Sequence, residues 1–90
     1  MREHILKTLP DYWAAAAAGE KMFEVRRDDR GFQKGDMLVL RRLEKTLSGV
    51  WREERCNDSY YDLHREIAYV LTGGQFGIEP GYVVLGLTKA

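Results

Sequence analysis

The chain has 90 residues, of which 44% are hydrophobic and 31% are charged, and its 14 lysines and arginines balance 14 aspartates and glutamates. This length suffices for one hydrophobic core, so we expect a single domain over residues 1–90 and exclude a multidomain enzyme. A formal net charge of zero argues against a protein that coats nucleic acid broadly, because such binding depends on a basic excess.

The sequence contains no apolar run near the roughly 20 residues that cross a bilayer, and its start lacks the features of a signal peptide. We therefore expect no membrane partner and a cytoplasmic location. Cys56 has no partner for an intrachain disulfide, and together with His4 and His64 it supplies too few ligands for zinc. We expect neither a metal nor a cofactor.

The first predicted elements are a short strand and a helix. Residues 4–7 fit an opening strand. Thr8 is the candidate N-cap of a helix of about three turns, with Pro10 in its first turn, Asp11 at a capping-box position and a run of alanines behind them. Gly19 is expected to end this helix by adopting the left-handed conformation.

Strands follow the helix. Residues 22–26 alternate, which predicts that Phe23 and Val25 point to the core while Glu24 and Arg26 share the opposite face, about 7 Å apart. Residues 37–40 are continuously apolar, which is typical of a strand covered on both faces.

At the beginning of the second half of the chain, the pattern of apolar and polar residues is weaker. Residues 42–60 show a turn at Ser48-Gly49 and a charged arm over residues 51–55, without a clear element. Residues 61–71 alternate as a long half-buried strand, with Tyr69 on its apolar side and Arg65 interrupting that side, and residues 81–87 form the last strand.

These elements predict an α+β, mainly β fold. One early helix and about five strands fit a small closed or partly closed β-barrel flanked by the N-terminal helix, because closure removes exposed sheet edges. An open α+β sheet is the alternative.

The candidate site is the corner between the helix and the first long strand. Lys21 lies at that corner, and Glu24 and Arg26 share one strand face. A carboxylate can accept from the N–H edge of a nucleobase while the cations bind carbonyls or phosphate. The alternative is a solvated strand with a weak Glu24–Arg26 surface pair.

The spacing Gly19-x-Lys21-x-x-Glu24-x-Arg26 resembles the signature of ASCH domains, a branch of the PUA-like superfamily. The resemblance covers residues 4–42 and 67–88 and is greatest to a small uncharacterised bacterial and phage family in that branch. The further motifs are His4-x-Leu6-Lys7-x-x-Pro10-x-Tyr12, Phe23-Glu24-Val25-Arg26 with Asp28-Asp29-Arg30-Gly31-Phe32, Gly35-Asp36-Met37-Leu38-Val39-Leu40, and Tyr69-Val70-Leu71 through Gly73-Gly74-x-Phe76-Gly77 to Gly81-Tyr82-Val83-Val84-Leu85. Residues 44–66 depart from the family pattern.

The resemblance implies a β-barrel with a helix-lined cleft that receives Lys21, Glu24 and Arg26, and a role with RNA or a modified nucleotide. In such a binding module we expect Arg26, Arg27 and Arg30 to contact phosphate. For base stacking we consider Tyr12, Trp13 and Trp51, and we favour Trp51 because it lies in a charged segment. Trp13 and Phe23 are expected to fill the core.

Two other functions stay open. Some ASCH members hydrolyse acylated nucleosides, and a hydrolase here would use Lys21 to activate water and Glu24 as the nearest acid, although those enzymes tend to have threonine where this chain has Glu24. The chain could instead be an accessory domain that binds a protein through the Trp51 arm or a free edge strand.

Overall fold

Strands dominate the structure and one short helix accompanies them, which confirms the α+β, mainly β prediction. The computed structural model describes residues 1–90. No helix is both long enough and apolar enough to cross a membrane. In chain order the elements are β1 (Glu3–Thr8), α1 (Pro10–Ala17), β2 (Phe23–Arg27), β3 (Met37–Lys45), β4 (Trp51–Glu53), β5 (Arg55–Cys56), β6 (Ser59–Tyr60), β7 (Asp62–Thr72) and β8 (Tyr82–Lys89).

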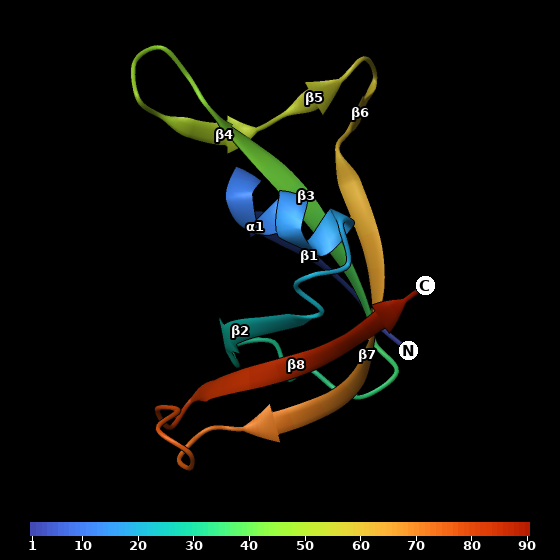
Figure 1. Cartoon of the computed structure of the whole chain (residues 1–90), viewed down its shortest axis with the longest axis vertical. Helices are drawn as coiled ribbons and strands as arrows, with labels where there is room; N and C mark the ends of the chain where they lie inside the picture. Colours follow the sequence, from blue (N-terminus) through green and yellow to red (C-terminus); the bar gives the residue numbers. More distant parts are fainter.

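The main sheet has the strand order β1-β3-β7-β8-β2 and stays open (Figure 1). β1 runs parallel to β3, and the other neighbours along this order are antiparallel. β4 pairs with the far end of β3, while β5 and β6 form a separate two-stranded ribbon. β1 and β2 are the two outer strands and do not pair with each other. The sheet is therefore not closed into a barrel, so the closed form of the predicted β-barrel is wrong, and the alternative of an open sheet describes the fold.

Arginine side chains take the place of a strand ladder between β1 and β2. The Nη2 of Arg26 donates to the carbonyl of Lys7 at 3.0 Å, and the Nη1 of Arg30 donates to the carbonyl of Ile5 at 2.9 Å. Because Ile5 and Lys7 are two residues apart in a strand, their carbonyls leave the same edge of β1. The guanidinium groups thus satisfy edge carbonyls that barrel closure would have paired with a strand.

The start of α1 differs from the prediction in its cap. The helix begins at Pro10, as expected for a proline in the first turn, but its N-cap is Leu9. Thr8 is instead the last residue of β1, and its hydroxyl donates to the carbonyl of Leu6 at 3.1 Å. The side chain that was expected to cap the helix is therefore used within the strand.

The end of α1 is fixed by a glycine and a buried arginine. The helix has eight residues, about two turns rather than three, and Gly19 beyond it has the expected positive φ of 79°. Arg65 of β7 is buried and donates its Nη2 to the carbonyl of Ala16 at 3.0 Å, so the interruption on the apolar side of β7 holds the helix end. The indole of Trp13 donates to the carbonyl of Leu40 at 3.0 Å and ties α1 to β3.

The core is centred on β3, β7 and β8. Both Leu38 and Val39 are buried, so β3 is covered on its two faces as predicted. The clustered buried residues are Leu6, Ala16, Phe32, Leu38, Leu40, Ile67, Val83, Leu85 and Leu87.

A bulge in β7 changes which side chains face this core. The register shifts between Ile67 and Tyr69, which leaves Ala68 without a partner on β8. The inward and outward faces exchange beyond the bulge, so Tyr69 is 64% exposed although Ile67 is fully buried. The prediction that Tyr69 lies on the apolar side is therefore wrong.

Residues 43–60 form a projection at one end of the molecule, which we call the arm (top of Figure 1). The expected turn is present, with the N–H of Thr46 donating to the carbonyl of Val50 at 2.8 Å. The charged segment after it is strand β4 followed by the β5–β6 ribbon.

Two arginines in the middle of β3 attach the arm to the sheet. Arg41 donates to both carboxylate oxygens of Asp62 at 3.0 Å and to Glu53 at 3.1 Å, and Arg42 binds both oxygens of Glu54. The hydrogen bonds to Asp62 raise the pKa of Arg41, and those to Glu54 raise the pKa of Arg42. Both arginines stay charged and hold the arm in one orientation.

At the start of β3, a buried carboxylate joins two segments of chain, the beginning of β1 and the turn that precedes β3. The Oδ2 of Asp36 lies 2.9 Å from the Nε2 of His4 in β1 and accepts the N–H of Gln33 at 3.1 Å, and its Oδ1 accepts the N–H of Arg2 at 3.2 Å. Burial raises the pKa of Asp36, but these hydrogen bonds outweigh burial and hold the pKa below its ordinary value. The ionised carboxylate is therefore the form that the fold stabilises.

We expect Asp36→Asn to lower the free energy of unfolding at pH 7 by about 2 kcal/mol, as for other hydrogen bonds to a charged group. The folded pKa lies below the unfolded value of about 3.9, so this stabilisation is complete above that value and is lost as the pH falls through the folded pKa. Urea unfolding from neutral pH down to about pH 3 should show the difference from wild type shrinking. The exposed Asp29→Asn should behave as wild type, and a difference that is constant with pH would contradict the assignment.

Candidate functional site

The polar face of β2 points into the molecule rather than out of it. Glu24 is only 3% exposed, whereas Phe23 is 45% exposed and Val25 also faces solvent. The prediction that Phe23 and Val25 point to the core is therefore wrong. Phe23 pairs across the ladder with Gly86 of β8, on the outer side of the sheet, and the inner side opposite β1 holds charged groups instead of apolar ones.

The buried carboxylate of Glu24 is shared between two cations. Its Oε2 accepts a hydrogen bond from the Nζ of Lys21 at 2.5 Å, and its Oε1 accepts one from the Nε of Arg26 at 3.0 Å. Lys21 also donates to the carbonyl of Phe23 at 2.8 Å. Both oxygens are thus satisfied, which is the condition under which a carboxylate can be buried without a large penalty.

Local sequence explains why these three side chains meet. Gly19, in the left-handed conformation, turns the chain out of α1, so that Lys21 precedes β2 and reaches along it. Glu24 and Arg26 are two residues apart in the strand and lie on the same face. The sequence prediction that Lys21, Glu24 and Arg26 come together is confirmed in these contacts.

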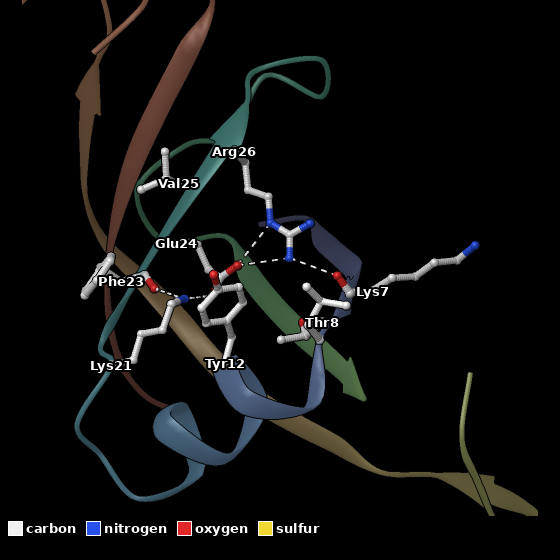
Figure 2. A pocket seen from close by; sticks show the side chains of 9 residues that line it. Lys7, Thr8, Tyr12, Lys21, Phe23, Glu24, Val25 and Arg26 are labelled. Carbon is white, nitrogen blue, oxygen red and sulfur yellow. Dashed lines mark hydrogen bonds and ion pairs between the residues drawn. The ribbon is translucent and has the colours of Figure 1, made fainter. Parts of the chain in front are cut away.

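A cavity of about 530 Å³ opens between β1, α1 and β2 with this cluster in its wall (Figure 2). We call it the β1–β2 pocket. Its lining residues are Lys7, Thr8, Leu9, Tyr12, Lys21, Phe23, Glu24, Val25 and Arg26. The pocket lies in the gap between β1 and β2, where the sheet stays open. The cluster of Lys21, Glu24 and Arg26 is therefore located at the open edge of the sheet.

Aromatic rings lie next to the lysine of the cluster. The Nζ of Lys21 is 5.0 Å from the ring centre of Phe23 and 5.6 Å from that of Tyr12. Tyr12 is 56% exposed, and its ring projects from α1 into the pocket (Figure 2). An exposed ring beside a cation offers a stacking surface for a flat ligand.

The charge of the pocket is positive although the chain is neutral. Lys7, Lys21 and Arg26 line it together with a single carboxylate, that of Glu24. Three cations and one anion leave two positive charges, which favours an anionic ligand. No three histidine, cysteine, aspartate or glutamate side chains are grouped so that they could hold a metal ion.

Three other predicted site residues lie outside the pocket. Arg27 extends over the ring of Tyr82, with its Cζ 5.5 Å from the ring centre. Arg30 donates to the carbonyl of Ile5 and so supports the edge of β1. Trp51 lies on β4 in the arm and lines a separate cavity.

Sequence reasoning missed the contribution of β1 to the pocket. Lys7 and Thr8 line it from β1, and Leu9 lines it from the turn into α1. Alternation alone cannot identify these residues, because their place depends on which strand lies opposite β2. A signal for this contribution of β1 was present in the motif Lys7-x-x-Pro10-x-Tyr12, because it contains both Lys7 and Tyr12, and both line the pocket.

We expect Glu24→Ala to destabilise the protein by about 2 kcal/mol, because it removes two charged hydrogen bonds and leaves two part-buried cations without their counter-ion. Chemical denaturation at neutral pH measures this change. Glu20→Ala, in the exposed turn before β2, is the matched control and should stay close to wild type. Equal stabilities of the two variants would contradict the role given to Glu24.

Comparison with known families gives a match over almost the whole chain. A family model described as "Domain of unknown function (DUF3850)" matches residues 3–87, a range that includes the entire β1–β2 pocket. No match is found among curated proteins. On the extent of this match, the chain belongs to the DUF3850 family.

Proposed function

We propose that this protein binds RNA or a modified nucleotide, with one nucleotide held in the β1–β2 pocket. The observation that carries the proposal is the buried Glu24, with Lys21 on one oxygen and Arg26 on the other, in the wall of a cavity of about 530 Å³. Cavities of this size accept small molecules, and polar groups that are already oriented give them specificity.

Each part of a nucleotide has a matching group in the pocket. Each oxygen of Glu24 accepts one hydrogen bond from a side chain and has a second acceptor site, so the carboxylate can also accept from the amino or imino edge of a base, as carboxylates do with cytosine N4. Tyr12 offers an exposed ring for stacking. Lys21 and Arg26 supply donors for a phosphate, and Lys7 adds positive charge to the pocket. The same net positive charge disfavours a cationic ligand.

The neutral chain fits one local site better than a long tract of contacts. Binding that neutralises many phosphates would need an excess of basic residues, and the net charge is zero. We propose further that the DUF3850 family shares the site arrangement of ASCH domains of the PUA-like superfamily. The support for this kinship is the Gly19-x-Lys21-x-x-Glu24-x-Arg26 spacing between a helix and a strand.

We expect Tyr12→Ala to weaken the binding of nucleoside monophosphates by about tenfold, because loss of one base-stacking contact costs about 1–3 kcal/mol. Isothermal titration calorimetry with a panel of the four common and several modified monophosphates measures the dissociation constants. Tyr12 is exposed, so the substitution should leave the fold intact.

Tyr69→Ala is the matched control for this variant. Tyr69 is also exposed, but it does not line the β1–β2 pocket. Its substitution should leave the dissociation constants unchanged. Absence of binding by the wild-type protein at low salt, or equal losses in both variants, would refute the proposal.

The ion pair between Lys21 and Glu24 in the wall of the pocket favours one second candidate, an amidohydrolase of acylated nucleosides. The pair would take a proton from the water that attacks the acyl carbon and deliver it to the leaving nitrogen as the C–N bond breaks. The protein then ends with the protons it began with. Glu24 is the only carboxylate in the pocket lining, so Lys21 and Glu24 must carry out both proton transfers.

A panel of N4-acylated cytidines at high protein concentration tests this second candidate. Turnover that disappears in Lys21→Ala, and persists in Lys34→Ala at an exposed position outside the pocket, would support it. We expect the rate to fall to background in the first variant, because no other amine and carboxylate are paired in the pocket. No turnover by the wild type would dismiss hydrolysis and leave the binding proposal intact.

A further inference from the structure

A second cavity of about 530 Å³ lies against the arm, and we call it the arm pocket. Strand β4 and the β5–β6 ribbon supply most of its wall, and β1 and the end of β3 supply Lys7 and Leu43. Among the residues that line it are Lys7, Trp51, Arg52, Glu53, Arg55 and Tyr60. None of the interactions proposed for a single nucleotide uses the residues of the arm.

Two cations of the arm pocket have no carboxylate partner. Arg52 pairs with Glu44 at 3.0 Å, and Glu53 is bound by Arg41 at 3.1 Å. Arg55 instead donates to the hydroxyl of Tyr60 at 3.1 Å. The ammonium group of Lys7 makes neither a hydrogen bond nor an ion pair, and in Figure 2 its side chain extends away from Glu24 and Arg26.

Trp51 is the ring of the arm pocket that is free to stack. It is 45% exposed, and its only close cation is Lys45, whose Nζ is 5.7 Å from the ring centre. The ring of Tyr60 is already engaged, because the Cζ of Arg41 is 3.9 Å from its centre and that of Arg55 is 5.0 Å away. Tyr60 therefore positions arginines, while Trp51 can receive a base.

Lys7 belongs to both cavities. It is the single residue that lines the β1–β2 pocket and the arm pocket together. Each pocket thus has an exposed aromatic ring, Tyr12 in one and Trp51 in the other, with an unpaired lysine between them. This order of ring, cation and ring matches the order of base, phosphate and base in a single strand.

We propose that the two pockets are neighbouring subsites for consecutive nucleotides of a single-stranded nucleic acid. One base stacks on Tyr12, the next on Trp51, and the phosphate between them lies at Lys7. This inference rests on the proposed function, because it takes the β1–β2 pocket as the first nucleotide site. The groups described bind bases and phosphates, which RNA and DNA share, so the experiment compares both.

The test measures the affinity for homopolymers of about five nucleotides, in RNA and in DNA form, against the corresponding mononucleotides. The wild-type protein should bind the best oligomer at least about tenfold more tightly than its mononucleotide. Trp51→Ala should abolish this gain and leave the mononucleotide affinity unchanged. Lys7→Ala should weaken oligomer binding and lower the slope of log affinity against log salt by about one.

Exposed residues outside both cavities give the controls, Phe76→Ala for the ring and Lys34→Ala for the charge. Neither should change oligomer binding. A gain that depends on Trp51 supports the inference in either polymer, and the tighter polymer identifies the ligand. Mononucleotide binding without any gain from the oligomer, or a gain that Trp51→Ala leaves intact, would overturn this inference alone. No mononucleotide binding at all would overturn the proposed function with it.

Discussion

The buried carboxylate of Glu24 is the group on which both the pocket and the edge of the sheet depend. It points inward from β2 at 3% exposure, and it can do so only because Lys21 and Arg26 satisfy both of its oxygens. Arg26, held by Glu24, then donates to the carbonyl of Lys7 in β1. One chain of hydrogen bonds therefore runs from the corner after α1 across β2 to the opposite edge of the sheet.

This arrangement explains how a small sheet leaves a gap without leaving the carbonyls at the edge of β1 unpaired. A closed barrel would pair β1 with β2 through backbone groups and would leave no room for a ligand. Here the long side chains of Arg26 and Arg30, rather than a neighbouring strand, donate to carbonyls of β1. The edges of β1 and β2 therefore stay apart, and a cavity of about 530 Å³ lies between them. The position of the pocket is thus a consequence of how the sheet ends.

The sequence predicted much of this structure where local patterns decide it. The apolar run at residues 37–40, the glycine after α1 and the meeting of Lys21, Glu24 and Arg26 all follow from spacing and side-chain chemistry. The orientation of β2 could not be predicted, because alternation gives two faces and only the tertiary environment decides which one is buried. In β2 the ion pairs of Glu24 allow the charged face to be buried, so the apolar side chains of Phe23 and Val25 face solvent.

The remaining errors have equally local causes. The exposure of Tyr69 depends on a one-residue bulge in β7, and no turn or proline signal marks it. Thr8 has the chemistry of an N-cap, but β1 continues through it in register with β3. The arm over residues 43–60 gave no periodic pattern, because the strands that follow β3 are only two or three residues long. The position of the arm depends instead on hydrogen bonds from Arg41 and Arg42.

The central claim is that the gap between β1 and β2 is a nucleotide site, and an NMR titration of the isotope-labelled protein with nucleoside monophosphates tests it most directly. The amide signals of residues 7–12 and 21–26 should shift together in a saturable manner, since these segments line the pocket. Amide signals around the exposed Tyr69, on the outer face of the sheet, should stay in place. Shifts confined to that outer face, or no saturable shift in residues 21–26, would contradict the account.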